Sequence, residues 1–299
     1  MKKVLITGAN SYIGTSVEKY ILEHYPEECS FYTVDMRDGT WKEKSFSGYD
    51  VVFHVAGIAH SDNGKISEEK AKMYYSVNTD LSIETAKKAK VDGVKQFIFM
   101  SSAIVYGSSS KVGKKKMITR DTPISPANAY GDSKVQAEKG IVSLEDSNFK
   151  VCVLRPPMIY GKGCKGNYLT LRKFALKLKF FPYVKNERSM LYIENLCEFV
   201  RLMILNEEGG IFFPQNSEYT NTSEMVKMIA AANGRKLHLV HGFGWAVKFL
   251  GLFTGLVKKA FGSLTYNKEK SMYGEEYQKY SLLQSIEETE SEQRNGNSK

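Results

Sequence analysis

The first 160 residues alternate short apolar runs with amphipathic stretches of helical period. The helical stretches lie at about 12–24, 69–90 and 130–142, and the apolar runs at 3–7, 31–34, 51–57, 96–102 and 150–157. Strands that are apolar on both faces are typical of a parallel sheet covered by helices on both sides. We therefore predict an α/β fold with a doubly wound parallel sheet, a Rossmann domain, over residues 1–160.

Beyond Gly161 this alternation ends, and loops rich in Gly, Asn and Tyr separate amphipathic helices. We predict a smaller C-terminal region for substrate binding, over residues 161–286, packed on the carboxyl edge of the sheet. Segments near 190–216, with a late strand at 211–216, are expected to complete the first domain. Residues 287–299 are polar, which predicts a disordered tail.

The first strand runs into the sequence TGANSYIG and then into a helix. Gly8 permits a tight turn, and the helix N-terminus directs N–H groups and partial positive charge at a pyrophosphate. Gly14 allows the helix to pack closely on the strand. Ser11 stands where a second glycine is usual, so its hydroxyl either crowds the pyrophosphate or bonds to it. Gly8, Ser11, Tyr12, Ile13 and Gly14 are therefore candidate dinucleotide contacts.

Asp35 ends the second strand at the distance where a carboxylate accepts hydrogen bonds from ribose hydroxyls. The same carboxylate would repel a 2′-phosphate, which favours NAD over NADP, and Arg37 weakens that preference. The alternative is that Asp35 is a turn residue. Ala56 and Gly57 follow the third strand and leave room for a ring or ribose, so they complete the candidate NAD contacts.

Ser102 closes the strand FIFMSS, and Tyr130 and Lys134 lie four apart on one face of a following helix. All three would meet at the carboxyl edge of the sheet. A nearby ammonium lowers the pKa of a phenol toward working pH, so Tyr130 could act as a base beside a nicotinamide. Ser102 could hold a substrate oxygen, and Lys134 the nicotinamide ribose. A Tyr-x-x-x-Lys spacing also occurs by chance, so this assignment depends on the other motifs.

The motifs together resemble the extended short-chain dehydrogenase/reductases, in particular the NAD-dependent epimerase/dehydratase group. The resemblance covers about residues 3–200 and rests on TGANSYIG, Asp35, HVAG, Asn78, FIFMSSAIVYG, YGDSK and LRPPMIYG. It implies that Ser102, Tyr130 and Lys134 are catalytic and that Asn78 supports the active site. Members act mostly on nucleotide-activated sugars.

Two residues argue against a dehydratase. Family members that eliminate water place an Asp-Glu pair where this chain has Ala103 and Ile104. Without these carboxylates, dehydration lacks an acid and a base. Epimerisation at C4, or simple ketone reduction or alcohol oxidation, remains.

The chain is most similar to the UDP-glucose 4-epimerase-like branch. This similarity implies Asn167 and Arg188 as diphosphate contacts, although the alternative is an exposed loop amide and a surface guanidinium. Met158 stands in place of a substrate-binding Asn, and a C-terminal Arg-Pro-Gly-Asp stretch is absent. Ser102, Ala103, Met158, Asn167 and Arg188 are the candidate substrate residues. The sugar contacts must therefore differ from those of the galactose enzyme.

The resemblance implies an NAD-dependent 4-epimerase of a nucleotide-linked hexose or N-acetylhexosamine, acting through a transient 4-ketone in surface polysaccharide synthesis. One alternative is an NAD(P)H-dependent reductase of a 4-keto sugar nucleotide. Another is an epimerase of a sugar carried on a lipid diphosphate at the membrane. A third is a dinucleotide or sugar-nucleotide sensor without turnover, which the intact Ser–Tyr–Lys set disfavours.

Residues 242–264 form a basic and apolar segment, GFGWAVKFLGLFTGLVKKAFGSL. It predicts a pair of helices forming a lid, with interfacial membrane contact as a further hypothesis. Residues 177–185, KLKFFPYVK, would add basic and aromatic surface. We expect a homodimer, as is common in the family, located in the cytoplasm and, on the membrane hypothesis, at the inner membrane surface.

Composition excludes several classes of protein. Four cysteines and five histidines show no metal-binding spacing, so we predict no metal and buried free thiols. The formal net charge of +9 invites a polyanionic partner, but no nucleic-acid motif accompanies it. The N-terminal apolar run is too short for a signal peptide, and no window reaches the ~18 apolar residues of a spanning helix.

Overall fold

The computed structural model of the chain describes residues 1–58, 66–244, 257 and 260–296. A sheet of six parallel strands forms its centre, in the order β10-β6-β4-β3-β1-β2. Its strands are β1 (Lys2–Thr7), β2 (Cys29–Val34), β3 (Val51–His54), β4 (Gln96–Met100), β6 (Lys150–Leu154) and β10 (Gly210–Phe212). The doubly wound parallel sheet predicted from the alternation is confirmed.

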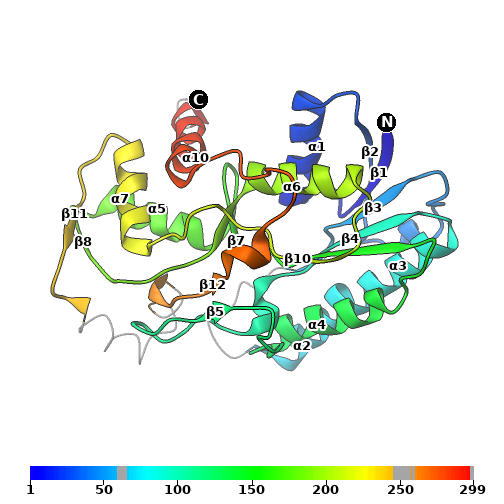
Figure 1. Cartoon of the computed structure of the whole chain (residues 1–299), viewed down its shortest axis with the longest axis horizontal. Coiled ribbons are helices and arrows are strands. Elements are labelled where there is room, and N and C mark those ends of the chain that lie inside the picture. Colours follow the sequence, from blue (N-terminus) through cyan, green and yellow to red (C-terminus); the bar gives the residue numbers. More distant parts are fainter. Residues whose placement is uncertain (59–65, 245–256, 258–259, 297–299) are drawn as a thin grey trace.

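Helices cover both faces of this sheet (Figure 1). One face carries α1 (Tyr12–His24) and α6 (Ile193–Leu205), and the other carries α2 (Glu68–Tyr74), α3 (Leu81–Val91) and α4 (Ala129–Val142). Strand side chains alternate between the two cores: Val4 and Ile6 of β1 pack with α1, whereas Leu5 packs with α3 and α4. We call the sheet and these helices the first lobe.

The helix predicted over 69–90 is interrupted. A turn of π-helix, Tyr75–Asp80, separates α2 from α3 and contains the buried Asn78. The Asn78 amide accepts from the backbone N–H of Ile58 at 2.8 Å and donates to its carbonyl at 3.2 Å. It also donates to Ser133 of α4 at 3.3 Å. Asn78 thus ties the loop after β3 to the helix that carries Tyr130 and Lys134.

The second lobe contains α5 (Asn167–Lys177), α7 (Thr222–Ala232) and α10 (Leu282–Gly296). Three pairs of short parallel strands connect these helices to each other and to the first lobe. They are β7 (Met158–Tyr160) with β9 (Met190–Tyr192), β8 (Phe180–Pro182) with β11 (His238–Val240), and β5 (Met117–Ile118) with β12 (Thr265–Tyr266). The chain crosses between the lobes several times, because α6 and β10 follow β9.

The prediction of a disordered tail over 287–299 was wrong for residues 287–296. Residues 282–296 form α10, which packs against α7. The carboxylate of Glu290 is buried and accepts hydrogen bonds from Tyr168 (2.8 Å), Arg172 (2.7 Å) and Asn233 (2.8 Å). A polar composition suggested disorder, but a buried carboxylate is tolerated where it is fully paired.

All four cysteines are buried and unpaired, as predicted. Among the described residues, no helix is long and apolar enough to cross a membrane. The basic and apolar segment predicted as a lid lies largely outside the described residues, since 245–256 and 258–259 are not among them.

Candidate active site

The carboxyl ends of the central strands meet at one edge of the sheet. Thr7 of β1 is in register with Val34 of β2 and His54 of β3, and Met100 of β4 with Leu154 of β6. The Thr7 hydroxyl and the buried His54 ring hydrogen-bond at 2.7 Å. Burial lowers the pKa of His54 to about 3, so this imidazole is neutral and structural. The loops that carry the candidate residues therefore start side by side.

Two glycines of the TGANSYIG turn stand where no side chain fits. Gly8 has φ +105°, and a Cβ there would lie 2.8 Å from the backbone nitrogen of Ala56. A Cβ at Gly14 would lie 2.6 Å from the Ser11 hydroxyl oxygen and 2.9 Å from Ile6. The turn and the close packing of α1 on β1 thus both require glycine, as the sequence predicted.

Ser11 is the N-cap of α1, and its hydroxyl accepts from the backbone N–H of Gly14 at 3.3 Å. The side chains of Tyr12 and Ile13 pack against the apolar core. The Tyr12 hydroxyl lies 3.1 Å from where a Cβ of Gly161 would stand, and burial raises the pKa of this phenol. Tyr12 and Ile13 can therefore contribute only backbone groups to the turn.

Asp35 follows β2 directly, and its carboxylate is ion-paired with Arg37. The Arg37 hydrogen bonds lower the pKa of Asp35 to about 2. On the next strand end, a Cβ at Gly57 would lie 3.1 Å from the Asn78 amide oxygen and 3.5 Å from Lys134 Nζ. Gly57 therefore borders directly on the Lys134 ammonium.

Lys134 is buried below the strand ends. Its Nζ donates to the Met100 carbonyl at 2.9 Å and lies 4.7 Å from the centroid of the Phe99 ring. Burial lowers the pKa of Lys134 to about 8, and the carboxylate of Glu138, one helical turn further on, opposes that change. The ammonium remains predominantly protonated at neutral pH.

Tyr130 lies in the first turn of α4, which Asn128 caps by accepting from Gly131 at 2.8 Å. Burial raises the pKa of Tyr130 to about 12, although a hydrogen bond with Ser102 acts in the opposite direction. The prediction that Lys134 brings this pKa toward neutrality is therefore not met in this structure. Desolvation of the phenol outweighs the hydrogen bond with Ser102, because the phenolate is the charged form.

A buried polar network that the sequence analysis missed joins α4 to the ends of β4 and β6. Glu138 accepts from Ser101 and, through both carboxylate oxygens, from Arg155 at 3.0 and 2.5 Å. Arg155 also donates to the Tyr106 hydroxyl at 2.7 Å. Two features of the sequence could have indicated this network: Glu138 follows Lys134 by four residues, and the motif LRPP contains Arg155.

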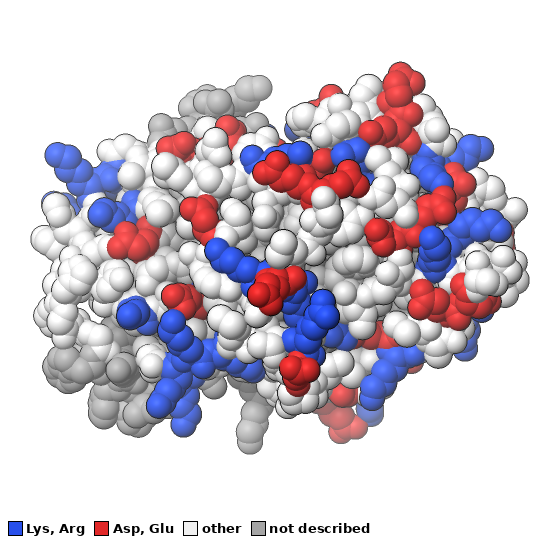
Figure 2. Space-filling view, in the orientation of Figure 1, with Lys and Arg blue, Asp and Glu red and all other residues white. Residues whose placement is uncertain are grey.

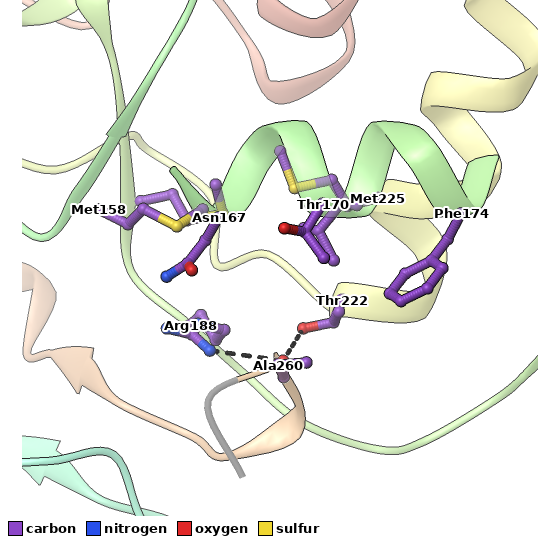
Figure 3. A pocket seen from close by; sticks show the side chains of 10 residues that line it. Met158, Asn167, Thr170, Phe174, Arg188, Thr222, Met225 and Ala260 are labelled. Carbon is purple, nitrogen blue, oxygen red and sulfur yellow. Dashed lines mark hydrogen bonds between the residues drawn. The ribbon is translucent and has the colours of Figure 1, made fainter. Parts of the chain in front are cut away.

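Three of the five predicted substrate residues line one pocket in the second lobe (Figure 3). Its volume is about 90 Å³, and its wall consists of Met158, Asn167, Thr170, Leu171, Phe174, Arg188, Met190, Thr222, Met225 and Ala260. Arg188 and Thr222 both donate to the Ala260 carbonyl, at 3.4 and 2.6 Å. Burial among these apolar side chains lowers the pKa of Arg188 to about 10. The pocket thus combines one cation with a largely apolar wall.

Ser102 and Ala103 do not line this pocket, but a backbone hydrogen bond joins Ala103 to the segment that leads into it. The N–H of Ala103 donates to the Pro156 carbonyl at 2.9 Å, two residues before Met158. The structure thus gathers Ser102, Tyr130 and Lys134 at the strand ends, with the pocket beginning at the neighbouring strand. No feature of the sequence indicated that four other residues line the pocket, because they lie on ordinary amphipathic helices. These residues are Thr170, Phe174, Thr222 and Met225.

The model of the NAD dependent epimerase/dehydratase family matches residues 4–212. The UDP-glucose 4-epimerase of Vibrio cholerae is 30% identical over 286 residues, with 88% of this chain and 86% of that protein covered. The N-acetyl-alpha-D-glucosaminyl-diphospho-ditrans,octacis-undecaprenol 4-epimerase of Escherichia coli O157:H7 is 26% identical, with 80% and 74% covered.

Solved structures share the fold. The dTDP-4-dehydrorhamnose reductase of Bacillus anthracis, in complex with NADP, superimposes with a TM-score of 0.71 at 19% identity, covering 98% of this chain and 99% of that one. The UDP-glucuronic acid 4-epimerase of Bacillus cereus, in complex with NAD, gives 0.68 at 16% identity, covering 98% and 99%. The glycine turn, the acidic end of β2 and the neighbouring Ser–Tyr–Lys set fit NAD, and the chain belongs to the NAD dependent epimerase/dehydratase family.

Proposed function

We propose that this protein is an NAD-dependent 4-epimerase of a nucleotide-linked hexose or N-acetylhexosamine, serving surface polysaccharide synthesis. The observation that supports this most directly is the placement of Ser102, Tyr130 and Lys134 at the edge of the sheet where the glycine turn also lies. The pocket that holds Asn167 and Arg188 begins at the next strand end. A shared edge lets one substrate contact both sets of residues.

The residues have separate roles in this proposal. Tyr130 takes the proton of the C4 hydroxyl and later returns it to the other face of the sugar, while Ser102 holds the reacting oxygen by a hydrogen bond. NAD held by the glycine turn and the strand ends would supply the hydride acceptor and donor for C4. Arg188 and Asn167 hold the diphosphate, and Met158 and Ala103 border the sugar. Rotation of the planar ketone in the pocket between the two transfers inverts C4.

We assign the cofactor contacts to the turn and the strand ends. The backbone of Gly8, Ser11, Tyr12, Ile13 and Gly14 faces the pyrophosphate at the N-terminus of α1. Asp35 accepts from the adenine ribose, Ala56 and Gly57 leave room beside β3, and Tyr130 and Lys134 contact the nicotinamide ribose.

The deciding experiment is incubation with a panel of UDP-sugars without added cofactor, followed by separation of the products. Interconversion of C4 epimers by protein that carries its own NAD is the expected result. The Tyr130→Phe variant should retain NAD and lose turnover. A protein that needs stoichiometric NADH or NADPH and yields a reduced sugar would instead be a 4-keto sugar reductase.

A second candidate is the epimerisation of a sugar carried on a lipid diphosphate. The apolar wall around Arg188, with Met158, Met190 and Met225, and the undecaprenol-linked epimerase among the relatives favour it. The product panel distinguishes the two when a prenyl-diphosphate sugar is included beside the nucleotide sugars.

We further propose a homodimer in the cytoplasm, with residues 242–264 as a lid or as a contact with the inner membrane surface. The four unpaired cysteines support a reducing compartment. Light scattering of the purified protein tests the assembly, and a monomeric mass at micromolar concentration would refute the dimer.

A further inference from the structure

The end of the second lobe presents a basic and aromatic surface at the strand pair β8–β11. Along β8 the side chains alternate: Phe180 is 65% exposed, whereas Phe181 is 5% exposed. Leu178, just before the strand, is 40% exposed, and Phe243, after β11, is 54% exposed. Leu178 and Phe180 are thus exposed two residues apart on one stretch of chain, and Phe243 is exposed beyond the other end of the strand pair.

The stretches of chain that form this surface carry basic side chains, with Glu187 and Glu224 just outside them. Residues 166–186 contain Arg172, Lys173, Lys177, Lys179 and Lys185 but no Asp or Glu. Residues 225–244 likewise contain three basic residues and no acidic one. Arg172 is neutralised by Glu290, whereas the four lysines of the first stretch are exposed. In Figure 2 blue side chains flank a white surface at the end of the molecule where Figure 1 places β8 and β11.

We propose that this surface, which we define by Lys177, Leu178, Lys179 and Phe180, docks on a bilayer that contains anionic phospholipid. Ammonium groups beside exposed Phe and Leu suit the interface, where the rings enter the acyl boundary and the lysines contact lipid phosphates. The inference rests on the membrane contact included in the proposed function. It locates that contact on described residues, outside the segment 245–256.

The same strand forms part of the wall behind the pocket. The ring of Phe181 lies 5.9 Å, centroid to centroid, from Phe174 and also 5.9 Å from Phe261. Phe174 lines the pocket, and Phe261 follows Ala260, which also lines it. Docking through Phe180 would therefore bring the pocket close to the lipid surface. This position suits a sugar diphosphate that stays attached to a lipid carrier.

The test is sedimentation of the full chain with two kinds of vesicle, one of phosphatidylcholine alone and one with added phosphatidylglycerol. We expect binding to the anionic vesicles that weakens as salt rises. The pair Lys177→Glu and Lys179→Glu should weaken it at least about tenfold, and Phe180→Ser should weaken it as well. Lys87→Glu with Lys95→Glu is the matched control, because these lysines are exposed, on α3 and just before β4, and Figure 1 shows these elements away from β8 and β11. The control should bind like the unaltered chain.

The outcomes test the membrane docking separately from the epimerase activity. No sedimentation of the unaltered chain at low salt overturns the proposal, and so does an equal loss in the test and control variants. An acidic protein partner in place of lipid would leave the vesicles unbound and also overturns it. Turnover of soluble UDP-sugars is measured in parallel: its absence contradicts the proposed epimerase, whereas normal turnover without vesicle binding contradicts only the docking surface.

Discussion

The Arg37 side chain donates from Nε to both oxygens of the Asp35 carboxylate, at 2.9 and 3.0 Å. The pair is solvent-exposed, so it contributes little to stability. Because the pair lies at the end of β2, we expect it to influence the preference for NAD over NADP. A free carboxylate there accepts from a ribose and repels a 2′-phosphate, whereas a guanidinium beside it attracts that phosphate.

We expect Arg37→Ala to weaken NADP binding about tenfold and to change NAD binding less than about threefold. The physical reason is the loss of one phosphate contact, since charge-assisted hydrogen bonds are worth ~1.5–3 kcal/mol. Calorimetric titration with both dinucleotides measures the ratio. Lys44→Ala, at another exposed basic residue, is the control. An unchanged NAD to NADP ratio would remove Arg37 from cofactor selection.

Tyr130→Phe should lower turnover by a factor of about 10²–10⁴, the usual contribution of a general acid–base. Bound NAD should remain, because the ring and its contact with Tyr74 at 5.5 Å between centroids are retained. Turnover and the NAD content of the purified variant are the two measurements. Tyr75→Phe, which removes a hydroxyl bonded to Asp132 at 2.9 Å, is the matched control and should keep its activity.

Lys134→Met should make the protein inactive but more heat-resistant at pH 7. Burial holds the pKa of Lys134 near 8, below its value in an unfolded chain, so the folded state holds fewer protons between pH 8 and about 10.5. The destabilisation is fully present below pH 8 and is relieved as pH rises through that window. The melting-temperature difference between variant and wild type should therefore shrink from pH 8 to 10. A constant difference would contradict this account.

Glu138→Gln should move the alkaline limb of the activity profile to lower pH. The Glu138 carboxylate raises the pKa of Lys134, so its removal lets the ammonium deprotonate earlier. The variant should also lose about 3–5 kcal/mol of stability, since Arg155 would be left as a buried charge without its partner.

Glu198→Gln is the control for that variant, because Glu198 is also buried and paired with an arginine, Arg201, at 2.9 Å. It should lose stability without moving the alkaline limb. Glu138→Asp, which keeps the charge, should restore the limb. Identical profiles for the Gln variants at positions 138 and 198 would leave Glu138 with a structural role alone.

Arg188→Met should raise the KM for the sugar substrate at least about tenfold and leave NAD bound, because a charge-assisted contact with a diphosphate is worth ~1.5–3 kcal/mol. Met fits the apolar wall that already holds Met158, Met190 and Met225. Steady-state kinetics over a range of substrate concentration separates KM from kcat. Lys185→Met, at a neighbouring exposed lysine, should behave like wild type. A change in kcat alone would place Arg188 outside substrate binding.

The local features of the fold followed from sequence because their causes are local. The positive φ of Gly8 and the four-residue spacing of Tyr130 and Lys134 depend on the chain nearby, although the space at Gly8 is also limited by Ala56 after β3. The buried network could not be found in this way, because Ser101, Glu138 and Arg155 are brought together only by the sheet. The sign of the pKa change at Tyr130 was missed for a related reason. It depends on how much water the packed chain excludes, which no spacing reveals.

The C-terminal helix was missed for the opposite reason, since its composition is polar although one side of it is buried. Glu287 and Glu288 suggest a solvated tail, but Ile286 and Glu290, one turn apart, are buried. The substitution of Met158 for a family asparagine was visible in the sequence. Its consequence, a pocket with three methionines around one guanidinium, needed the coordinates.

Glu290 joins α10 to both α5 and α7, which carry most of the pocket wall. Because α5 and α7 also contact each other directly, α10 is the last element to join them, after nearly the whole chain has been synthesised. The central sheet has all six of its strands once residue 212 has emerged. Dinucleotide capture can thus precede the maturation of the sugar-binding half during biosynthesis.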